Sequence, residues 1–233
     1  MLEENVLVNV EELFDIGYHY DEIEQNVELM KKYYLMAIDR GCSEAMYNMG
    51  SYYKNKQEYP LMKTYYLMAI DHDCVDAMYS LAFHYHKTEP NFDLMKTYYL
   101  MAIDYGDIKA MHNLATYYCE EENFDLMKTY YLMAIDNGEV HAMNDFGMYY
   151  GIMEENVDEM KKYYLMAIEK EFERAINNLE MRYEEQYNKH ISSLALYQDL
   201  VQLPPNKLIE DKLNELRLKE VTCFWKKKLQ KSK

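Results

Sequence analysis

The hexapeptide Tyr-Tyr-Leu-Met-Ala-Ile occurs five times in this chain and restricts its possible folds more than any other feature. The copies begin at Tyr33, Tyr65, Tyr98, Tyr130 and Tyr163, so they lie 32 or 33 residues apart. Residues 93–104 and 125–136 are identical throughout. A fixed period of this size is typical of a stacked array of one small structural unit. We therefore expect one elongated array instead of one or two ordinary domains.

Each hexapeptide lies in a predicted helix. In the second copy the apolar residues Met62, Tyr65, Tyr66, Ala69 and Ile70 fall at helical spacing on one face. The residues Leu67 and Met68 widen this face, and a helix that is apolar around most of its girth must pack on several sides. An asparagine that can cap the helix precedes four of the copies, at Asn26, Asn91, Asn123 and Asn156, and an acidic residue follows two positions later. Glu58 and Pro60 replace this pattern before the second copy.

Each repeat contains one more predicted helix, which precedes the hexapeptide helix in the sequence. It carries Ala45, Met46, Met49, Gly50 and Tyr53 in one repeat and equivalent residues in the others. A small residue recurs in it at Gly17, Gly50, Ala82, Ala115 and Gly147. Glycine in a helix costs about 1 kcal/mol relative to alanine. We therefore expect the two helices to cross closely at this residue.

The pattern predicts an all-α solenoid of helix–turn–helix repeats in two parts. Residues 1–189 form an array of about five and a half pairs, which starts with a weaker copy over Val10–Tyr20. Residues 190–233 form capping helices: one over 191–203, stopped by Pro204 and Pro205, and one begun by Asn206 that extends to about Leu229 and ends in a basic tail. The caps are expected to cover the last repeat through Leu194, Leu200, Ile209, Leu213 and Leu216.

The combined pattern Ala-x-x-x-Met/Leu-Gly/Ala-x-x-Tyr, a short loop, then x-x-Tyr-Tyr-x-x-Ala-Ile resembles the Sel-one-like repeat (SLR), a relative of the tetratricopeptide repeat. The amino-acid sequence of the hexapeptide is similar to the versions of this repeat that are abundant in giant viruses of amoebae, such as those of the Mimivirus kind. The resemblance covers residues 8–189 and implies a right-handed α/α superhelix that serves as an interaction scaffold, with no catalytic residues. The Gly-x-Gly loop of the family is replaced here, and Met30 and its equivalents stand where the family has a small residue.

Charge and cysteine content narrow the function classes. A net charge of −16 disfavours nucleic acid or an anionic membrane as partner of the whole molecule. The last 30 residues differ, with nine Lys or Arg against four acids. The N-terminus lacks the features of a signal peptide, and no 18-residue apolar run exists. The four cysteines show neither a disulfide framework nor zinc-type spacing. The sequence thus predicts reduced thiols and a cytoplasmic protein, in the host cytoplasm if it is viral.

No catalytic, metal or cofactor site is predicted. The seven histidines lie in different repeat registers, and only His84 and His86 are close, where i, i+2 spacing on a helix points them to different faces. We expect them to lie on the surface or to line a groove. Nucleophile–base patterns and a Gly-rich phosphate loop are lacking, so no enzyme and no small-molecule substrate is predicted.

The candidate site comprises positions on the first helices that vary between repeats, on the side opposite the predicted core. In superhelices of this kind the first helices line the concave wall. The predicted partner-binding residues are Glu44, Tyr47, Asn48, Asp76, Tyr79, Phe83, Lys109, His112, Asn113, His141, Asp145, Met148 and Arg174. They form a groove that runs from acidic, near Glu44 and Asp76, to basic, near Lys109 and Arg174.

Two functions remain open from the sequence. The first is a protein–protein adaptor that holds a peptide or helix of a partner in this groove. In the alternative, the basic C-terminal tail docks on nucleic acid, an acidic partner or a membrane, and the array is a spacer. Drift at exposed sites explains the variable positions equally well, although Tyr47, Tyr79 and Phe83 are larger and more apolar than drift favours.

Overall fold

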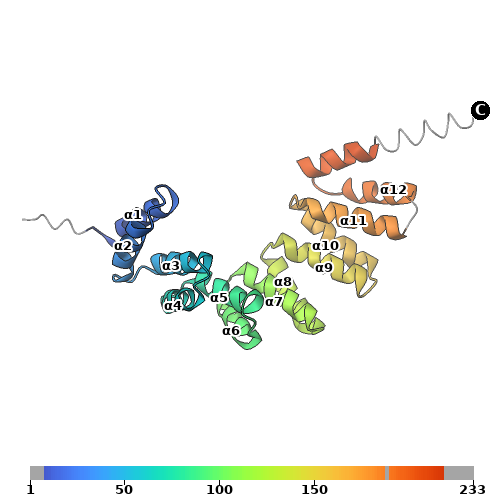
Figure 1. Ribbon diagram of the computed structural model, residues 1–233. Coiled ribbons are helices and arrows are strands. Elements are labelled where there is room, and N and C mark those ends of the chain that lie inside the picture. Colours follow the sequence, from blue (N-terminus) through green and yellow to red (C-terminus); the bar gives the residue numbers. More distant parts are fainter. Residues whose placement is uncertain (1–7, 187–188, 218–233) are drawn as a thin grey trace, which may run out of the picture. The chain divides into compact units, whose positions relative to one another are not determined.

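The computed structural model of the protein describes residues 8–186 and 189–217, except for the side chains of residues 186, 189–192 and 194, and these residues form helices and short loops without a β-strand. The helices are α1 (Val10–Glu22), α2 (Val27–Ile38), α3 (Ser43–Asn55), α4 (Tyr59–Ile70), α5 (Val75–Lys87), α6 (Phe92–Asp104), α7 (Ile108–Glu120), α8 (Phe124–Asp136), α9 (Val140–Ile152), α10 (Val157–Glu169), α11 (Glu173–Gln186) and α12 (Lys189–Leu200). One more helix spans 207–217 (Figure 1). The all-α prediction is confirmed.

The helices pack as consecutive pairs, as a solenoid requires. We call α1, α3, α5, α7, α9 and α11 the A helices, and α2, α4, α6, α8 and α10 the B helices. Four of the A helices pack most extensively on the B helix that follows them: α1 on α2, α3 on α4, α5 on α6 and α9 on α10. Each of α2, α4, α8 and α10 also packs on the next A helix. The chain divides into two compact units, 1–110 and 111–233, which are described separately below.

One buried tyrosine in each pair forms the centre of its packing. These are the second tyrosines of the hexapeptides, Tyr34, Tyr66, Tyr99, Tyr131 and Tyr164, and at most 3% of each is exposed. The rings of Tyr34 and Tyr66 lie against the glycines of the preceding A helices. A Cβ added to Gly17 would lie 2.6 Å from Tyr34, and one added to Gly50 would lie 2.4 Å from Tyr66. The predicted close crossing at the small residue is confirmed at these pairs.

The first tyrosine of each hexapeptide makes a second repeated contact. It stacks on the last tyrosine of the A-helix pattern in the same pair, with ring centroids 5.5–6.1 Å apart and planes within 8–14° of parallel. The five pairs are Tyr20–Tyr33, Tyr53–Tyr65, Tyr85–Tyr98, Tyr118–Tyr130 and Tyr150–Tyr163. Offset aromatic pairs contribute about 0.5–1.5 kcal/mol beyond their buried area. The repeated Tyr-Tyr thus joins the two helices of every pair.

The helix ends explain the loop sequences. Asn26, Asn91, Asn123 and Asn156 each accept a hydrogen bond from the backbone N–H three residues later, at 3.1–3.3 Å, which confirms the predicted caps. Glu58 makes no such bond. After each B helix a residue with positive φ lets the next backbone N–H bond to the carbonyl of the hexapeptide alanine. This arrangement is a Schellman motif, so the invariant alanine also ends its helix.

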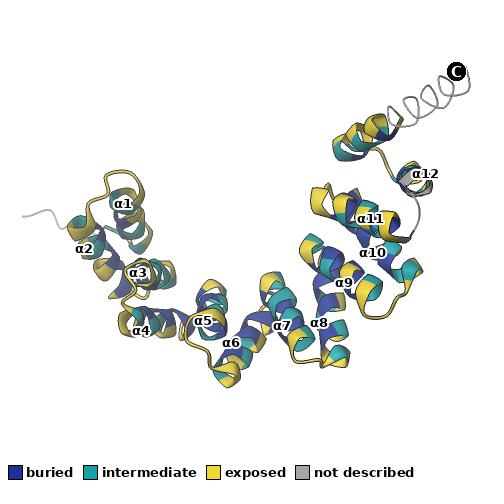
Figure 2. Cartoon of the chain, turned by 45° about the vertical axis from the view of Figure 1, so that its right-hand side comes forward, coloured by how far each residue is buried: buried dark blue, intermediate teal, exposed yellow. Residues whose placement is uncertain are grey.

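Burial follows the pair packing, with buried residues between helices and exposed residues on their outer sides (Figure 2). One expectation from the sequence is wrong at this level. His84 and His86 are buried, 1% and 8% exposed, instead of lying on the surface. They do point to different partners: Nε2 of His84 lies 3.1 Å from Glu89, and Nδ1 of His86 lies 3.4 Å from the hydroxyl of Tyr99.

The helices after the array pack on its last pairs. The helix α12 packs on α11, and Tyr183 of α11 donates a hydrogen bond to Asp199. The predicted cap Asn206 accepts from the N–H of Ile209 at 2.9 Å, while its amide donates to the carbonyls of Ile168 and Glu169. These two bonds attach the start of the helix 207–217 to the end of α10, where the carbonyl of Ile168 also accepts from the N–H of Glu171.

Some predictions for this region change or are not tested. The helix α12 ends at Leu200 rather than 203, and Leu200, Ile209 and Leu216 are buried whereas Leu213 is half-buried. The side chain of Leu194, and the residues 218–233 of the basic tail, lie outside the described residues. The division into an array over 1–189 and caps over 190–233 stays a prediction.

Cys42, Cys74 and Cys119 are free thiols, and Cys223 lies outside the described residues. Across the described ranges, no helix is long and apolar enough to cross a membrane.

Candidate functional site

The candidate site lies on the A helices, beside the line along which each packs on its B helix, and several of its residues also contact B-helix tyrosines. The A helices of successive pairs contact each other, as α1 contacts α3 and α9 contacts α11. Among the described helices, no two B helices make a comparable contact. Within each unit, neighbouring A helices therefore lie closer to one another than neighbouring B helices do. We call the varying positions of the candidate site the variable face; they are the thirteen predicted site residues together with Ser51, Ser80, Thr116, Asn144, Asn177, Asn178 and Met181.

In the first unit the predicted aromatic anchors are half-buried and held by other rings. Tyr47 stacks on Tyr66 with centroids 5.7 Å apart, and Tyr79 lies 6.0 Å from Tyr99. Phe83 stacks on Tyr79 at 6.2 Å, and the ammonium of Lys54 lies 5.9 Å from the Phe83 ring. These contacts fix the rings before a partner arrives, which lowers the entropy cost of binding.

Two polar residues of the variable face in this unit form hydrogen bonds with buried tyrosines. The amide of Asn48 donates to the hydroxyl of Tyr34 at 3.1 Å, and Ser51 lies 3.2 Å from the hydroxyl of Tyr66. Burial raises the pKa of Tyr34 far above its ordinary value. Because its amide group can form more than the one bond to Tyr34, Asn48 both satisfies this buried hydroxyl and retains hydrogen-bonding capacity toward the surface. The prediction treated it as a surface amide only.

Acidic residues stand at the start of these A helices. Glu44 and Asp76 are both exposed, in the first turns of α3 and α5. Backbone N–H donation to Glu44, followed by a hydrogen bond from Ser43, lowers the pKa of its carboxyl. The carboxyl of Glu44 therefore remains charged at neutral pH, as the predicted acidic end requires.

In the second unit the predicted residues form a hydrogen-bonded chain between A helices. Nε2 of His112 on α7 lies 2.9 Å from Asp145 on α9. Asn144 donates to Asp145 at 3.0 Å and accepts from Asn178 on α11 at 2.8 Å. Asn144 is only 2% exposed, so this position of the variable face is buried. Because it bonds to neighbours on both sides, its role is to join α9 to α11.

Other residues of the second unit are open to solvent. Met148 and Met181 are 41% and 47% exposed, and they hold equivalent positions on α9 and α11. His141 is exposed, 2.9 Å from Glu139 and 4.9 Å between ring centroids from Phe172. Arg174 is exposed, as is Lys109 at the end of the first unit, and Asn113 is half-buried. Exposed methionines provide an apolar surface that adapts to different partners.

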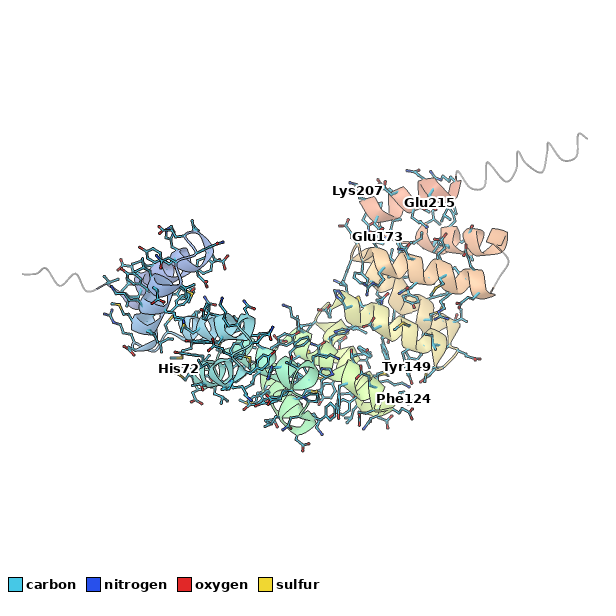
Figure 3. All side chains as sticks on the ribbon, viewed as in Figure 1. His72, Phe124, Tyr149, Glu173, Lys207 and Glu215 are labelled. Carbon is cyan, nitrogen blue, oxygen red and sulfur yellow. The ribbon has the colours of Figure 1, made fainter. Side chains whose placement is uncertain are left out.

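A cleft that the sequence did not predict lies between α11 and the helix 207–217. Its volume is about 300 Å³, and it is lined by Glu173, Ile176, Asn177, Leu208, Asp211, Lys212 and Glu215. In Figure 3, Glu173, Lys207 and Glu215 lie close to one another along these two helices. Asn177 belongs to the variable face, so the cleft opens beside it. Its carboxylates lie where a basic groove end was predicted, so the simple acidic-to-basic gradient does not extend to this cleft.

A network around B-helix lysines was also missed. Lys63 pairs with Glu89 at 2.8 Å, and Lys128 pairs with Glu154 at 2.5 Å, each linking a B helix to the loop that follows the next A helix. Near the second pair, Phe124 and Tyr149 lie 5.5 Å apart between ring centroids (Figure 3). The recurrence of a lysine directly after the repeated Met was the available signal. Among the described side chains, no three His, Cys, Asp or Glu residues gather as a metal site would require.

Solved structures show which fold this arrangement has. The chain is similar to a protective antigen of uropathogenic Escherichia coli strains that displays an SLR fold, with 17% identity and a TM-score of 0.66 over 91% of this chain and 50% of that chain. It is also similar to a Sel1 repeat protein from Oxalobacter formigenes, with 18% identity and a TM-score of 0.66 over 94% and 91% of the two chains. An immunity protein from Pseudomonas aeruginosa matches with 18% identity and a TM-score of 0.51 over 90% and 82%.

The chain therefore has the SLR fold, which confirms this part of the resemblance seen in the sequence. It spans half the length of the Escherichia coli antigen. No family model matches the sequence, and the comparison with curated proteins gave no match.

Proposed function

We propose that the protein is a non-enzymatic adaptor that holds a peptide or helix of a partner protein on the variable face. The observation that carries the proposal is the contrast between the two kinds of helix. The B helices repeat almost unchanged, whereas the A helices differ at nearly every residue of the variable face. A surface that changes from repeat to repeat along a regular scaffold fits a partner that is not itself repetitive.

The chemistry of the face supports a protein as partner. Half-buried aromatic rings in the first unit and exposed methionines in the second offer apolar anchors, and amides and carboxylates beside them can bond a peptide backbone. Aromatic residues supply much of the binding energy at protein interfaces. The rings of Tyr79 and Phe83 are the proposed principal anchors, because they stack on each other and are held by Tyr99.

The finer parts of the proposal are the place of action and the partner. The amino-acid sequence of the repeats favours a viral protein that acts on viral or host complexes. The free thiols of Cys42, Cys74 and Cys119 are suited to the reducing environment of the cytoplasm. The alternative, in which the basic tail docks on nucleic acid, an acidic partner or a membrane, concerns residues outside the described ranges. It stays a prediction that rests on the charge of the tail.

A photo-crosslinking residue at position 83 tests the proposal. We expect it to capture a protein from the lysate of the cells in which the protein is made, which mass spectrometry then identifies. The same residue at position 61 is the control, because Leu61 is 40% exposed on a B helix. Capture of the same protein from both positions, or from position 61 alone, would contradict the assignment of the variable face.

The double variant Tyr79→Ala/Phe83→Ala measures how much the anchors contribute. We expect it to lower the affinity for the captured partner by about 2–4 kcal/mol, in the range of interface hot spots. Because Tyr79 also packs on Tyr99, the melting temperature of the variant must be measured beside its affinity. The double variant Leu61→Ala/Leu126→Ala, which removes two exposed B-helix side chains, should bind like the unmodified protein.

A further inference from the structure

The B helices present a second surface whose constancy the proposed function does not explain. The leucine of the hexapeptide is identical in all five copies, yet it is substantially exposed in the first unit: Leu35 by 43%, Leu67 by 42% and Leu100 by 39%. The A helices of the same repeats have diverged. Recent duplication alone would leave both helices alike, and packing inside the array involves only the covered part of each leucine, so its exposed part needs a further explanation.

An aspartate lies one helical turn beyond each of these leucines. Asp39, Asp71 and Asp104 are four residues further along and therefore on the same side of the helix end. All three are exposed, and within the described residues none of them forms an ion pair. We call these six residues, Leu35, Leu67, Leu100, Asp39, Asp71 and Asp104, the leucine–aspartate strip.

The chain itself contains a segment with the opposite charge and matching apolar groups. Residues 218–233 hold six lysines and one glutamate, a net charge of +5, while the remaining 217 residues carry −21. Phe224, Trp225 and Leu229 lie among the lysines. Lysines can pair with the aspartates of the strip while the aromatic residues cover its leucines. A membrane surface or a nucleic acid, being anionic, would be repelled by the same aspartates.

We propose that residues 218–233 of one copy dock on the leucine–aspartate strip of a second copy. The strip belongs to the first unit, and the segment continues from the second unit. Pairing between copies therefore requires no particular arrangement of the two units in one chain. The contact joins molecules head to tail, so it is heterologous and can continue from copy to copy.

The single tryptophan of the chain, Trp225, reports on this docking directly. In 50 mM salt we expect its emission to shift to shorter wavelength as the protein concentration rises, in parallel with an increase of the sedimentation coefficient. Raising the salt to about 0.5 M should reverse both changes, because screening weakens charge pairing. A blue shift that does not depend on protein concentration would show docking within one chain and overturn the proposal, as would the absence of any shift.

Three full-length variants test the surface itself. Asp39→Lys/Asp71→Lys/Asp104→Lys should need at least about tenfold more protein for half-association, and Leu35→Gln/Leu67→Gln/Leu100→Gln should behave similarly without any change of charge. The control Glu120→Lys/Glu121→Lys/Glu122→Lys makes the same charge change on exposed residues of another loop and should associate normally. Equal loss in this control would mean general charge attraction and would overturn the assignment of the strip.

Mixing two variants separates docking from misfolding. The aspartate-reversed variant keeps its tail, and Lys226→Glu/Lys227→Glu/Lys228→Glu keeps its strip. Neither should associate alone, but a mixture should form pairs, because the tail of the first fits the strip of the second. A mixture that stays monomeric while both variants melt like the unmodified protein would overturn the proposal.

Discussion

At the scale of single residues, the contact between a small A-helix residue and a buried tyrosine decides how closely a pair can pack. The ring of Tyr66 lies over Gly50 and is held on its other sides by Tyr47 and by the hydroxyl of Ser51. Little free movement is left to it. The sequence could predict the crossing, because glycine is costly in a helix, but it could not indicate which ring fills the space.

The variant Gly50→Ala should destabilise the protein by about 1–2 kcal/mol. Its Cβ would lie 2.4 Å from the Tyr66 ring, and overpacking of this kind costs about 1–3 kcal/mol, against a helix-propensity gain of up to about 1 kcal/mol. Urea denaturation measures the difference. Gly147→Ala, where the closest approach would be 3.1 Å, should cost less. A more stable Gly50→Ala protein would mean that the ring can move aside.

The buried tyrosines also make the fold sensitive to alkali. Burial raises the pKa of Tyr164 to about 12 from an ordinary value of 10.0. Below pH 10 the hydroxyl is protonated in both the folded and the unfolded protein, so it causes no pH dependence there. Between pH 10 and 12 the unfolded chain loses this proton first, and stability falls by up to about 1.4 kcal/mol per pH unit.

Replacement of this one tyrosine should therefore flatten the alkaline slope. We expect the free energy of unfolding of Tyr164→Phe to depend less on pH between 10 and 12 than that of the unmodified protein. Tyr18→Phe is the control, since Tyr18 is 49% exposed. An unchanged slope in Tyr164→Phe would show that its hydroxyl does not remain protonated in the fold at these pH values.

At the scale of helices, the sequence predicted most boundaries and caps, because periodicity and cap residues act locally. It failed where contacts between repeats decide the outcome. Asn144 looks like a surface residue in its own helix, yet its bond to Asn178 comes from the next pair and buries it. His84 is similar, because its ring lies 4.9 Å from that of Tyr59, which belongs to the preceding helix α4. Such partners cannot be read from a helical period.

The start of α4 lacks a side-chain cap, so it can be used to test how much a capping residue stabilises this fold. Glu58→Asn should stabilise the protein by about 0.5–1 kcal/mol, because it supplies the side-chain acceptor that the equivalent asparagines provide. Asn91→Ala should destabilise it by about 1 kcal/mol through loss of the bond to Leu94. Thermal unfolding of both variants measures the two effects. If Glu58→Asn left stability unchanged, Pro60 would already determine the start of this helix.

At the scale of the molecule, the repeat period predicted the solenoid, but the function of its faces depends on partners that no residue pattern names. The thirteen predicted site residues include exposed groups such as Arg174 and Met148, and others such as Asn48 and Asp145 that already bond within the protein. The cleft beside α11 was missed because it is formed with the helix 207–217, which lies outside the repeat.

Removal of residues 187–233 tests whether the last helices act as a cap. We expect the shortened protein to aggregate or to lose its last pair, because Ile176, Leu179 and Tyr183 on α11 would lose the helices that cover them. Sedimentation and circular dichroism measure this. A soluble fragment with unchanged helix content and unfolding temperature would assign these helices to another role.

The parallel tyrosine pairs have an optical consequence. Each described pair holds two nearly parallel rings with centroids at most 6.1 Å apart, and the only tryptophan lies at position 225, outside the repeats. Neighbouring rings in such a fixed geometry couple their electronic transitions. The near-ultraviolet dichroism of the array should therefore contain five similar tyrosine couplets beside the contributions of other ring contacts, such as Tyr47 with Tyr66. The loss of one helix pair removes one of these couplets, so unfolding can be followed repeat by repeat.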